Sequence, residues 1–546
     1  MAFGRGTTTE PIGRWRGDAS HLESDPEAVG ALLHAVQTPL FAVQHEGGVA
    51  FTDSGEVTVG GADETGLPLL AWAPAGPARQ LGDASFTRSH GLKLNYVAGA
   101  MAGGIASVEL VKSMARAGML GVFGAAGLDL DTVEAALVRL STDLFDRPWA
   151  ANLIHSPYEP ALENGIVDLY LRRGVQLISA SAYLDLTLPL LRYRLHGLHR
   201  APDGTVVALN RVLAKVSRVE VAEKFLSPPP PAMLRALVES GAITAETAAL
   251  AAHIAVADDL IVEADSGGHT DNRPALTLLP TMLGLRDRMA ALHDFPTTPR
   301  VGAAGGIGTP AAAAAAFSMG AAFVVTGTVN QACREAGTSD TVRAMLADAR
   351  QADVTMAPAA DMFEMGVELQ VLRRGTLFPM RARKLWELYR THPSLEAIDA
   401  AERKKLEQSI FRASTDEVWA QTQSFWQARD PGQLERAGAD PKHRMALCFR
   451  WYLGQTSRWA TSGVEDRKAD YQVWCGPAIG AFNEWTRGSC LEPWEARRVV
   501  PVALNLMHSA AVLTRVNNLT AQGLALPTQA VDVQPQPVGA LEEFAQ

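Results

Sequence analysis

Between about Gly91 and Thr326, short apolar runs alternate with segments of helical character, and this alternation limits the possible folds more than any other feature. Such a pattern is typical of successive βα units, in which each strand returns through a crossover and pairs in parallel with the one before it. The apolar runs lie at 93–98, 119–124, 148–154, 175–180, 211–216, 259–264, 299–304 and 321–326. Eight parallel strands predict an α/β fold, the TIM (β/α)8 barrel.

The segments between these strands predict the outer helices of the barrel. We expect helices at 106–117, 130–141, 160–173, 230–240, 244–256, 275–291 and 309–319. The last begins with Thr309-Pro310, where threonine is suited to the N-cap and proline to the first helical position. Residues 199–211 predict a β-hairpin between the fourth and fifth strands, with Asp203-Gly204 as its turn.

The remainder of the 546-residue chain predicts further units around the barrel. We expect a small N-terminal α+β domain (1–85), the barrel (86–335), a large helical insertion after strand eight (336–490), a C-terminal helix returning to the barrel (491–523) and a disordered tail (524–546). An insertion of this size beside a barrel loop usually serves as a substrate lid or a partner-binding module.

Charge and cysteine spacing exclude several classes of function. The net charge is −10, and no Lys/Arg cluster is interleaved with aromatic residues, so we expect no nucleic-acid partner. The four cysteines have no metal-ligand spacing, so we expect no metal site and a reducing compartment. The N-terminus lacks a signal-peptide pattern, and the longest apolar stretch, 311–325, is shorter than the roughly twenty residues of a membrane span. These features predict a cytoplasmic protein without a membrane partner.

The stretch LIVEADSGGHT (260–270) brings a titratable side chain to the end of a predicted strand. In a barrel, functional groups lie at the carboxyl ends of the strands, so His269 is a candidate to donate a proton or polarise a carbonyl. A lone histidine is also often structural. Asp265 would orient His269 or contact a ligand; alternatively it is a helix cap or an exposed loop charge.

Glycine-rich loops follow strands one, seven and eight. AGAMAGGIAS (98–107) would let a flat ring lie against the backbone, or it is only a tight turn. VGAAGGIGTP (301–310) and VVTGTVNQ (324–331) end neighbouring strands, the usual phosphate site of this barrel, because free N–H groups and a helix dipole favour an anion. The candidates are Gly305, Gly306, Gly327 and Thr328; the alternative is that Gly305-Gly306 is merely a turn.

Two polar residues lie within apolar strands. Asn152 in ANLI (151–154) would hydrogen-bond a ring edge from the barrel mouth or simply satisfy neighbouring backbone groups. Lys215, near the end of RVLAKVS (211–217), is a cation at a strand end, which more often serves a ligand than a core. Nucleophilic hydrolysis is disfavoured, because there is no GxSxG motif and Cys333 has no evident base.

Six segments together resemble a known family. They are AMAGG (100–104), AGMLGVFGAAG (117–127), ANL (151–153), DSGGH (265–269), GAAGGI (302–307) and GAAFVVTGT (320–328). In this order they resemble the flavin-dependent barrel shared by nitronate monooxygenases and flavin-type enoyl-acyl-carrier-protein reductases. The later segments 357–389, 440–454 and 470–485 resemble the trans-acting enoyl reductases that serve polyunsaturated fatty acid synthases and trans-acyltransferase polyketide synthases.

The resemblance implies FMN as the cofactor, together with the residues that hold it. The isoalloxazine would lie near Ala100, Met101 and Ala102, with Asn152 at its edge and Gly267-Gly268 beside it. The phosphate would lie at Gly305, Gly306, Gly327 and Thr328. His269 matches the histidine that the family places over the flavin as a catalytic residue. Lys215 is a further candidate for catalysis and cofactor binding, which follows from its position at a strand end and not from the resemblance. Asp265 departs from the family, in which glutamate is frequent, so its role is in doubt.

The resemblance also implies the reaction and its partners. We expect NADPH to reduce FMN and the flavin to reduce the double bond of an enoyl thioester on an acyl carrier protein, within a polyketide or fatty acid synthase. The carrier protein is acidic, and a basic group in the helical module, either a docking surface or a solvated face, consists of Arg373, Arg374, Arg381, Arg383 and Lys384. The alternatives are a nitronate monooxygenase and a non-catalytic barrel scaffold. The oligomeric state stays open, with a homodimer as the commonest assembly.

Overall fold

A closed barrel of eight parallel strands lies at the centre of the computed structural model, which describes residues 10–60, 65–156, 159–537 and 539. In chain order its strands are β6 (Tyr96–Ala98), β7 (Leu120–Phe123), β8 (Ala150–Ile154), β9 (Leu177–Ser181), β12 (Arg211–Val216), β13 (Asp259–Glu263), β14 (Arg300–Ala304) and β15 (Val324–Thr326). β15 pairs with β6 and closes the barrel. The predicted TIM barrel is confirmed.

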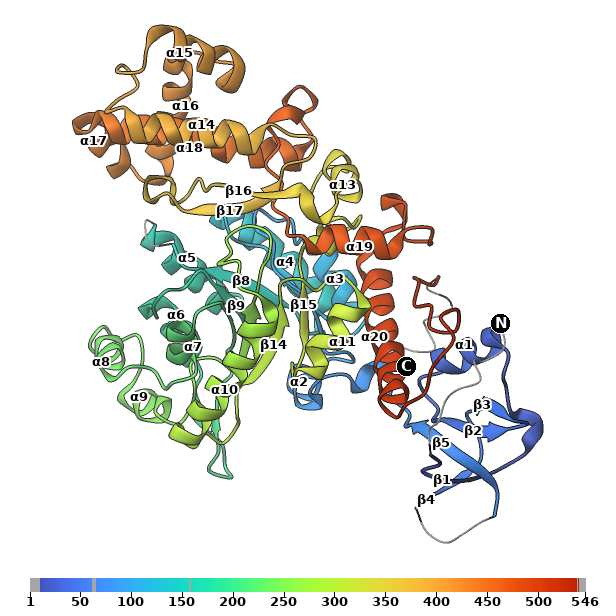
Figure 1. Cartoon of the computed structure of the whole chain (residues 1–546). Coiled ribbons are helices and arrows are strands. Elements are labelled where there is room, and N and C mark those ends of the chain that lie inside the picture. Colours follow the sequence, from blue (N-terminus) through green and yellow to red (C-terminus); the bar gives the residue numbers. More distant parts are fainter. Residues whose placement is uncertain (1–9, 61–64, 157–158, 538, 540–546) are drawn as a thin grey trace.

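Helices surround the barrel, as expected of its βα units (Figure 1). They are α3 (Val108–Arg116), α4 (Leu130–Leu144), α5 (Pro160–Arg172), α6 (Leu188–Leu195), α7 (Val219–Phe225), α8 (Pro231–Glu239), α9 (Ala245–Ala251), α10 (Ala275–His293), α11 (Pro310–Ser318) and α12 (Thr328–Gln331). The predicted hairpin is present as β10 (His199–Arg200) and β11 (Val206–Val207). The sequence prediction had omitted α6, α7 and the single turn α12.

A buried ion pair closes the floor of the barrel beneath the strands. Asp259 accepts hydrogen bonds from Arg300 and lies 2.8 Å from Nε2 of His90, which ends helix α2 (Ala84–His90). Phe86 of the same helix stacks on Phe323 with a centroid distance of 4.0 Å. The floor is therefore fully packed, and access to the interior is from the carboxyl ends of the strands.

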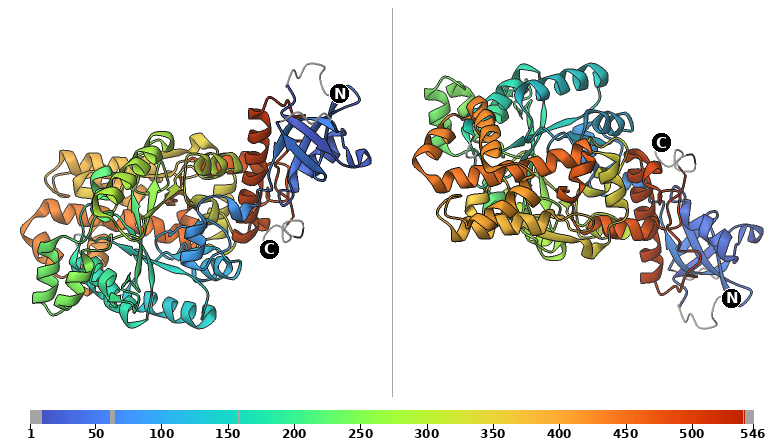
Figure 2. Two further views of the ribbon diagram at one scale, coloured as in Figure 1. Left: turned by 90° about the horizontal axis from the view of Figure 1, so that it is seen from below. Right: turned by 90° about the horizontal axis from the view of Figure 1, so that it is seen from above.

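The N-terminal part of the chain forms an antiparallel sheet of its own, with strand order β3-β2-β5-β1-β4. Its elements are β1 (Gly13–Arg16), α1 (Pro26–His34), β2 (Leu40–His45), β3 (Gly48–Thr52), β4 (Glu56–Val59) and β5 (Leu67–Ala73). Trp15 is buried among the apolar residues of one face of this sheet. This sheet lies to one side of the barrel, with helix α20 (Val499–Ala521) between the two (Figures 1 and 2).

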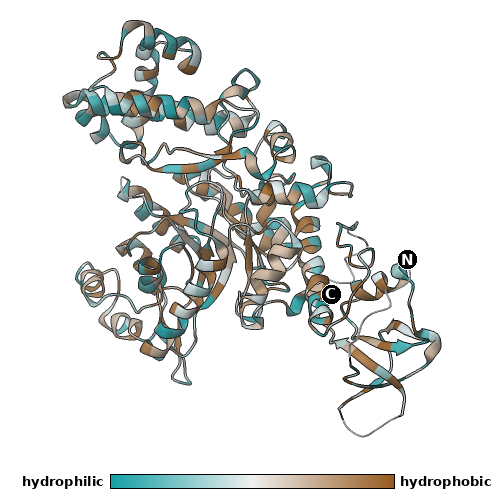
Figure 3. Cartoon of the chain, in the orientation of Figure 1, coloured by the Kyte–Doolittle hydropathy of each residue, from teal (hydrophilic) through white to brown (hydrophobic). Residues whose placement is uncertain are grey.

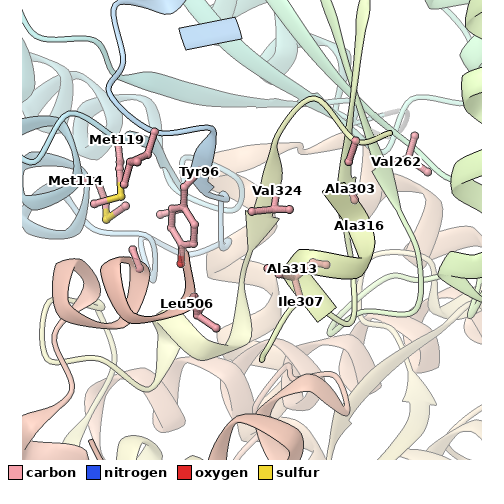
Figure 4. Close-up of a cluster of buried hydrophobic side chains, with 14 of the residues drawn as sticks. Tyr96, Met114, Met119, Val262, Ala303, Ile307, Ala313, Ala316, Val324 and Leu506 are labelled. Carbon is pink, nitrogen blue, oxygen red and sulfur yellow. The ribbon is translucent and has the colours of Figure 1, made fainter. Parts of the chain in front are cut away.

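Helix α20 joins the N-terminal sheet to the barrel. It packs on α11 and α3 of the barrel and on α1 and β5 of the N-terminal part. Leu506 lies near Tyr96 of β6 within one apolar cluster (Figure 4). By length and composition α20 would be long and apolar enough to cross a membrane, but 78% of its apolar window is buried inside the protein. Its apolar composition is explained by this packing.

The segment after α20 corrects an expectation. The tail 524–546 was predicted to be disordered, yet its described residues pack against the protein: Leu524 and Ala530 are buried, and the Val533 carbonyl accepts from the indole of Trp485. Gln536 exchanges hydrogen bonds with Asn505 of α20. Pro, Gln and acidic residues suggested disorder, but isolated apolar residues among them are buried against the rest of the protein. Residues 538 and 540–546 lie outside the described residues.

The insertion after strand eight is not purely helical, which corrects a second expectation. Its helices are α13 (Asp340–Ala347), α14 (Phe378–Thr391), α15 (Ala400–Lys405), a π-helix (Leu406–Phe411), α16 (Thr415–Arg429), α17 (Gly432–Ala439), α18 (Pro441–Ser462) and α19 (Ala478–Thr486). Between α13 and α14 lies an antiparallel hairpin of β16 (Val354–Pro358) and β17 (Glu368–Leu372). Short 3-10 turns occur at Ala19–His21, Ala78–Gln80, Gln351–Asp353, Phe363–Met365, Glu465–Asp470 and Trp494–Ala496.

The hairpin β16–β17 lies between the barrel and helices α14 to α18 (Figure 1). Seen from above, these helices overlie one end of the barrel (Figure 2). The barrel strands and α20 are mostly hydrophobic, whereas α14 and its neighbours carry many hydrophilic residues (Figure 3). The helical module, defined as residues 336–490, therefore covers the barrel end at which the hairpin lies.

Candidate functional site

Strand periodicity places two charged residues inside the barrel near the carboxyl ends of neighbouring strands. Leu213 and Ile261 belong to the barrel-interior cluster, so Lys215 and Glu263, two residues further on, face the same way. The Lys215 ammonium lies 3.0 Å from the Glu263 carboxylate. Glu263 was not a predicted site residue, although the same two-residue period along LIVE would have identified it.

Asn152 also faces the barrel interior, two residues after Ala150. Its side chain is buried, and its amide nitrogen donates to the Ser179 carbonyl and to the Ser181 hydroxyl, both at 2.9 Å. Both N–H groups of the amide therefore donate to β9, which fits the alternative in which Asn152 satisfies neighbouring groups of the fold. In the described part of the chain no partner is found for Oδ1, which is the atom left to meet a ligand.

The loops after β14 and β15 lie side by side, because Ala304 pairs with Val325. Gly305 and Gly306 both have positive φ, and a Cβ on Gly305 would lie 2.6 Å from the Ala264 carbonyl group, so only glycine fits there. Gly306 and Gly327 have no atom within 4 Å of a Cβ position, which leaves open space over both. Helix α12 begins after Gly327, and the first N–H groups of a helix have no partner within it.

The loop after β6 packs onto the end of β7 next to this space. Ala100 packs against the barrel-interior cluster, and a Cβ on Gly124 would lie 1.8 Å from the Met101 carbonyl oxygen. Ala102 closes a turn through its carbonyl, which accepts from the Ile105 N–H at 3.3 Å. Because β6 and β15 are neighbours, this backbone lies beside the Gly327 loop. The residues expected at the ring and at the phosphate therefore lie on adjacent loops.

Thr328 already has one partner from the far end of the helical module. Its hydroxyl accepts from the Gly476 N–H at 3.2 Å. A Cβ on Gly308 would lie 2.4 Å from the Ala478 carbonyl oxygen, so this segment is in direct contact with both glycine loops. The hydroxyl proton of Thr328 is still available for an anion.

His269 lies in a frame that the helical module supplies. Its Nε2 is 3.1 Å from the Asp361 carboxylate, in the turn between β16 and β17, and the edge of its ring meets Trp474 at a centroid distance of 5.5 Å. Burial of Asp361 opposes its ionisation. The hydrogen bond and the charge of His269 outweigh this effect, so the pKa of Asp361 is lowered. None of these partners was predicted, because they are separated from His269 by about ninety residues or more.

Gln370 of β17 holds the loop that carries His269. Its backbone exchanges hydrogen bonds of 2.9 and 2.7 Å with Gly268, and its side-chain amide donates to Asp265 Oδ1 and to the Ser266 carbonyl at 2.9 and 2.8 Å. A Cβ on Gly267 would lie 2.6 Å from the backbone of Cys475. The double glycine is therefore needed for close contact with the module.

Asp265 serves this loop rather than His269. Its Oδ1 accepts from Asn272 and from Gln370, each at 2.9 Å, and its backbone N–H bonds the Arg273 carbonyl. The described residues provide no hydrogen bond between Asp265 and His269. Of the alternatives considered for Asp265, loop structure has direct support.

Most of the basic group that was expected to be a docking surface or a solvated face is paired with neighbouring groups of the module. Arg381 pairs with the buried Asp470, Lys384 with Glu402 at 2.7 Å, and Arg374 with Asp353 at 3.4 Å. Arg383 donates to the Met356 carbonyl. These cations stabilise the module internally, since each lies beside an acid or a carbonyl that sequence distance had concealed.

Metal and thiol chemistry have no support in the described part of the chain, where no group of His, Cys, Asp or Glu side chains could hold a metal ion. Cys333, Cys448 and Cys475 are buried free thiols. Burial raises the pKa of the Cys448 thiol to about 12, and it also raises those of Cys333 and Cys475, so these thiols are poor nucleophiles.

Comparison with known families gives matches along most of the chain. Residues 89–416 match nitronate monooxygenase, residues 15–75 match the N-terminal domain of the fatty acid synthase subunit PfaD, and residues 392–471 match the inserted helical domain of [acyl-carrier-protein] S-malonyltransferase. The nitronate monooxygenase match alone covers more than half of the chain.

Similar proteins come from lipid and polyketide biosynthesis. One subunit of the polyunsaturated fatty acid synthase of Thraustochytrium is 48% identical over 84% of this chain and 31% of its own length. The polyketide biosynthesis protein PksE of Bacillus subtilis is 46% identical over 80% of this chain and 57% of its own. The chain thus spans between 22% and 57% of the first four curated relatives.

A solved structure matches the fold more completely. The enoyl reductase domain of MlnA, from the macrolactin biosynthesis cluster of Bacillus amyloliquefaciens, is 40% identical with a TM-score of 0.78, covering 81% of this chain and all of that one. The chain therefore belongs to the nitronate monooxygenase family, in the branch that contains the synthase-associated enoyl reductases.

Proposed function

We propose that this protein is a trans-acting enoyl reductase that uses NADPH and FMN to reduce the α,β double bond of an enoyl thioester on an acyl carrier protein. The observation that carries the proposal is the likeness to the MlnA enoyl reductase domain, which is matched over its full length. Relatives named as polyunsaturated fatty acid synthase and polyketide biosynthesis proteins support a role beside a synthase.

Open space and hydrogen-bond donors at the barrel mouth support a site for FMN. Gly306 and Gly327 leave open space on adjacent loops, and the start of α12 with the Thr328 hydroxyl offers donors to a phosphate. The backbone at Ala100, Met101 and Ala102 provides a narrow wall for a flat ring, and Asn152 offers Oδ1 at its edge. When bound, FMN would supply the hydride chemistry, which the side chains lack.

The side chains then have two tasks during reduction. A hydride arriving at the β-carbon moves the double-bond electron pair toward the thioester carbonyl, so a donor must stabilise the developing enolate. His269, held between Asp361 and Trp474, is our candidate for that donor. The Lys215–Glu263 pair holds one ammonium group inside the mouth, where Lys215 is our candidate for a hydrogen-bond donor to a ligand.

The helical module is our candidate for contact with the carrier protein. Its segment 392–471 matches a helical domain that occurs in an acyl-carrier-protein malonyltransferase. The module also contacts both the His269 loop and the loops around Gly308 and Thr328. A substrate held by this module would therefore be delivered at the carboxyl ends of the barrel strands.

The proposal is tested by purified protein with FMN, NADPH and a carrier-bound crotonyl thioester. We expect NADPH oxidation that depends on the thioester and yields the saturated acyl group. The rival function, oxidation of nitroalkanes, is favoured by the name of the matching family. It requires oxygen and no NADPH, so oxygen uptake on a nitroalkane without thioester reduction would replace our proposal. A protein that binds no flavin would instead indicate a scaffold.

A further inference from the structure

A second imidazole lies at the carboxyl end of a barrel strand, apart from the His269 loop. His155 directly follows β8, and its backbone N–H bonds the Ser181 carbonyl at 3.1 Å, which fixes it to the end of β9. Its side chain is 24% exposed. Functional groups of TIM barrels lie at this end, so the position alone makes His155 a candidate.

A buried carboxylate orients this imidazole. Nδ1 of His155 lies 2.9 Å from Oε2 of Glu163, whose side chain is only 3% exposed. An ionised carboxylate only accepts, so the ring carries a proton on Nδ1 and turns Nε2 away from Glu163. Among the described residues, Nε2 has no hydrogen-bond partner. An acid side chain that fixes one imidazole nitrogen and leaves the other free is the arrangement of acid–base histidines.

The rest of the cluster holds Glu163 in place. Its Oε1 accepts from the Tyr183 hydroxyl at 3.0 Å and from the Thr187 hydroxyl. Burial, together with the charge of Glu163, raises the pKa of Tyr183 well above its usual value, so this hydroxyl stays a donor. The Tyr183 ring also stacks on the His155 ring at a centroid distance of 5.3 Å. The imidazole is therefore held on one face by Tyr183 and at one edge by Glu163.

The cluster adjoins both the cofactor candidates and the helical module. A small cavity of about 20 Å³ is lined by Asn152, Ser156 and Glu163, among others, so the carboxylate partner of His155 and the next residue along the chain share a space with the residue expected at the ring edge. Glu159, four residues after His155, pairs with Arg429 of α16, Nη2 lying 3.0 Å from Oε2. His155 thus lies where the barrel rim meets the module.

We infer that His155, oriented by Glu163, is a second acid–base residue of the site and supplies the proton to the α-carbon of the enoyl thioester. The inference rests on the proposed function. As the β-carbon accepts the hydride, the electron pair of the double bond forms the enolate; the α-carbon then takes the proton from Nε2 of the imidazolium, and the imidazole regains a proton from water. His269 is left with the stabilisation of the carbonyl oxygen.

The test is stopped-flow kinetics of the FMN-loaded protein, with the two half-reactions measured separately. In His155→Ala we expect hydride transfer from NADPH to change less than about twofold, while reduction of carrier-bound crotonyl thioester slows by about 10²- to 10⁴-fold, the usual contribution of a general acid. Added imidazole should restore part of that rate. The matched control is His199→Ala, which removes an exposed histidine of the hairpin strand β10 and should alter neither step.

A purely structural cluster would give different results. Tyr183→Phe removes one hydrogen-bond donor to Glu163 and keeps the His155 imidazole. Its rates therefore show the effect of loosening the cluster while the proton donor is still present. Equal slowing of both half-reactions in His155→Ala, in proportion to Tyr183→Phe and without rescue by imidazole, would overturn the inference. A wild-type protein that reduces no enoyl thioester would overturn the proposed function as well, whereas an active wild type with a fully active His155→Ala refutes only this inference.

Discussion

At the scale of single residues, the site combines positions that the sequence reveals with partners that it conceals. Lys215 is identified by its place near the end of an apolar strand, Asn152 as a polar residue within one, and His269 by the glycine loop that follows one. Glu263 obeys the same two-residue period as Lys215 and was predictable. Asp361 was not, because its proximity to His269 depends on how a hairpin some ninety residues later folds back over the barrel.

Replacement of His269 tests the candidate donor. His269→Ala should leave flavin absorbance and NADPH-dependent flavin reduction nearly unchanged, because the residues expected to hold the FMN phosphate lie on other loops, after β14 and β15. Enoyl reduction should fall by at least about 10²-fold, since a donor aimed at developing negative charge is lost. Rapid-kinetic measurement of both steps checks this. Wild-type enoyl reduction in the variant would remove His269 from the mechanism.

The buried floor of the barrel predicts a dependence of stability on pH. Burial opposes ionisation of Asp259, but His90 and Arg300 outweigh it, so its pKa lies below the model-compound value of 3.8. The unfolded chain then binds the proton more readily, and the stabilisation present above pH 4 is lost as pH falls through the folded pKa. Denaturant unfolding of the wild type between pH 6 and pH 3 should show this decline.

Asp259→Asn isolates that ion pair. It leaves the Arg300 guanidinium buried without its counter-charge, which we expect to cost about 3–5 kcal/mol of unfolding free energy at pH 7. The acid-dependent part of the decline should also become smaller in this variant. A variant as stable as the wild type at pH 7, with an unchanged pH profile, would contradict this account of the floor.

At the scale of elements, β17 is the strand that links the helical module to the His269 loop. The stretch VELQVL (367–372) alternates apolar and polar residues, so it carried a strand signal within a region otherwise read as helical. That Gln370 meets Gly268 could not be predicted, since a lone antiparallel bridge leaves no mark in either segment.

Gln370→Met measures the importance of this link. The substitution keeps the length of the side chain and removes its two donors to Asp265 and Ser266, so the loop should loosen. We expect flavin content to be retained, enoyl reduction to fall by about tenfold, and stability to drop by about 1–3 kcal/mol for the acceptors left unpaired. Steady-state kinetics and thermal unfolding provide the two measurements.

The control for that variant is Gln433→Met in the same module. Gln433 also makes two side-chain hydrogen bonds, to Asp430 and His443, but no contact of Gln433 with the His269 loop is recorded among the described residues. A similar loss of activity in both variants would show that general loosening of the module, and not the position of the loop, is responsible.

At the scale of the whole molecule, the barrel was predictable and the structure around it only in part. Eight successive βα units favour a closed barrel, because each right-handed crossover can place the next strand beside the one before it. The tail was predicted as disordered, since composition does not show that Leu524 and Ala530 are buried in the apolar cluster that includes α20. The ion pairs of Arg374, Arg381 and Lys384 within the module could not be predicted either, because each acid partner lies many residues away in the sequence.

Removal of residues 524–546 tests the role of the tail. Disorder would make this truncation neutral. The packing predicts a melting temperature lower by several degrees, since exposure of the groove left by Leu524 alone corresponds to about 1.5–3 kcal/mol. Thermal unfolding followed by circular dichroism is sufficient, and an unchanged melting temperature would contradict the packed arrangement.

We propose that the barrel mouth, together with the module above it, reduces an enoyl thioester. The most direct measurement is anaerobic incubation of the FMN-loaded protein with NADPH and a carrier-bound crotonyl thioester, followed by mass spectrometry of the acyl carrier. The account predicts that the acyl group gains the mass of two hydrogen atoms in proportion to the NADPH consumed. An unchanged crotonyl group, with flavin reduced and substrate present, would contradict it.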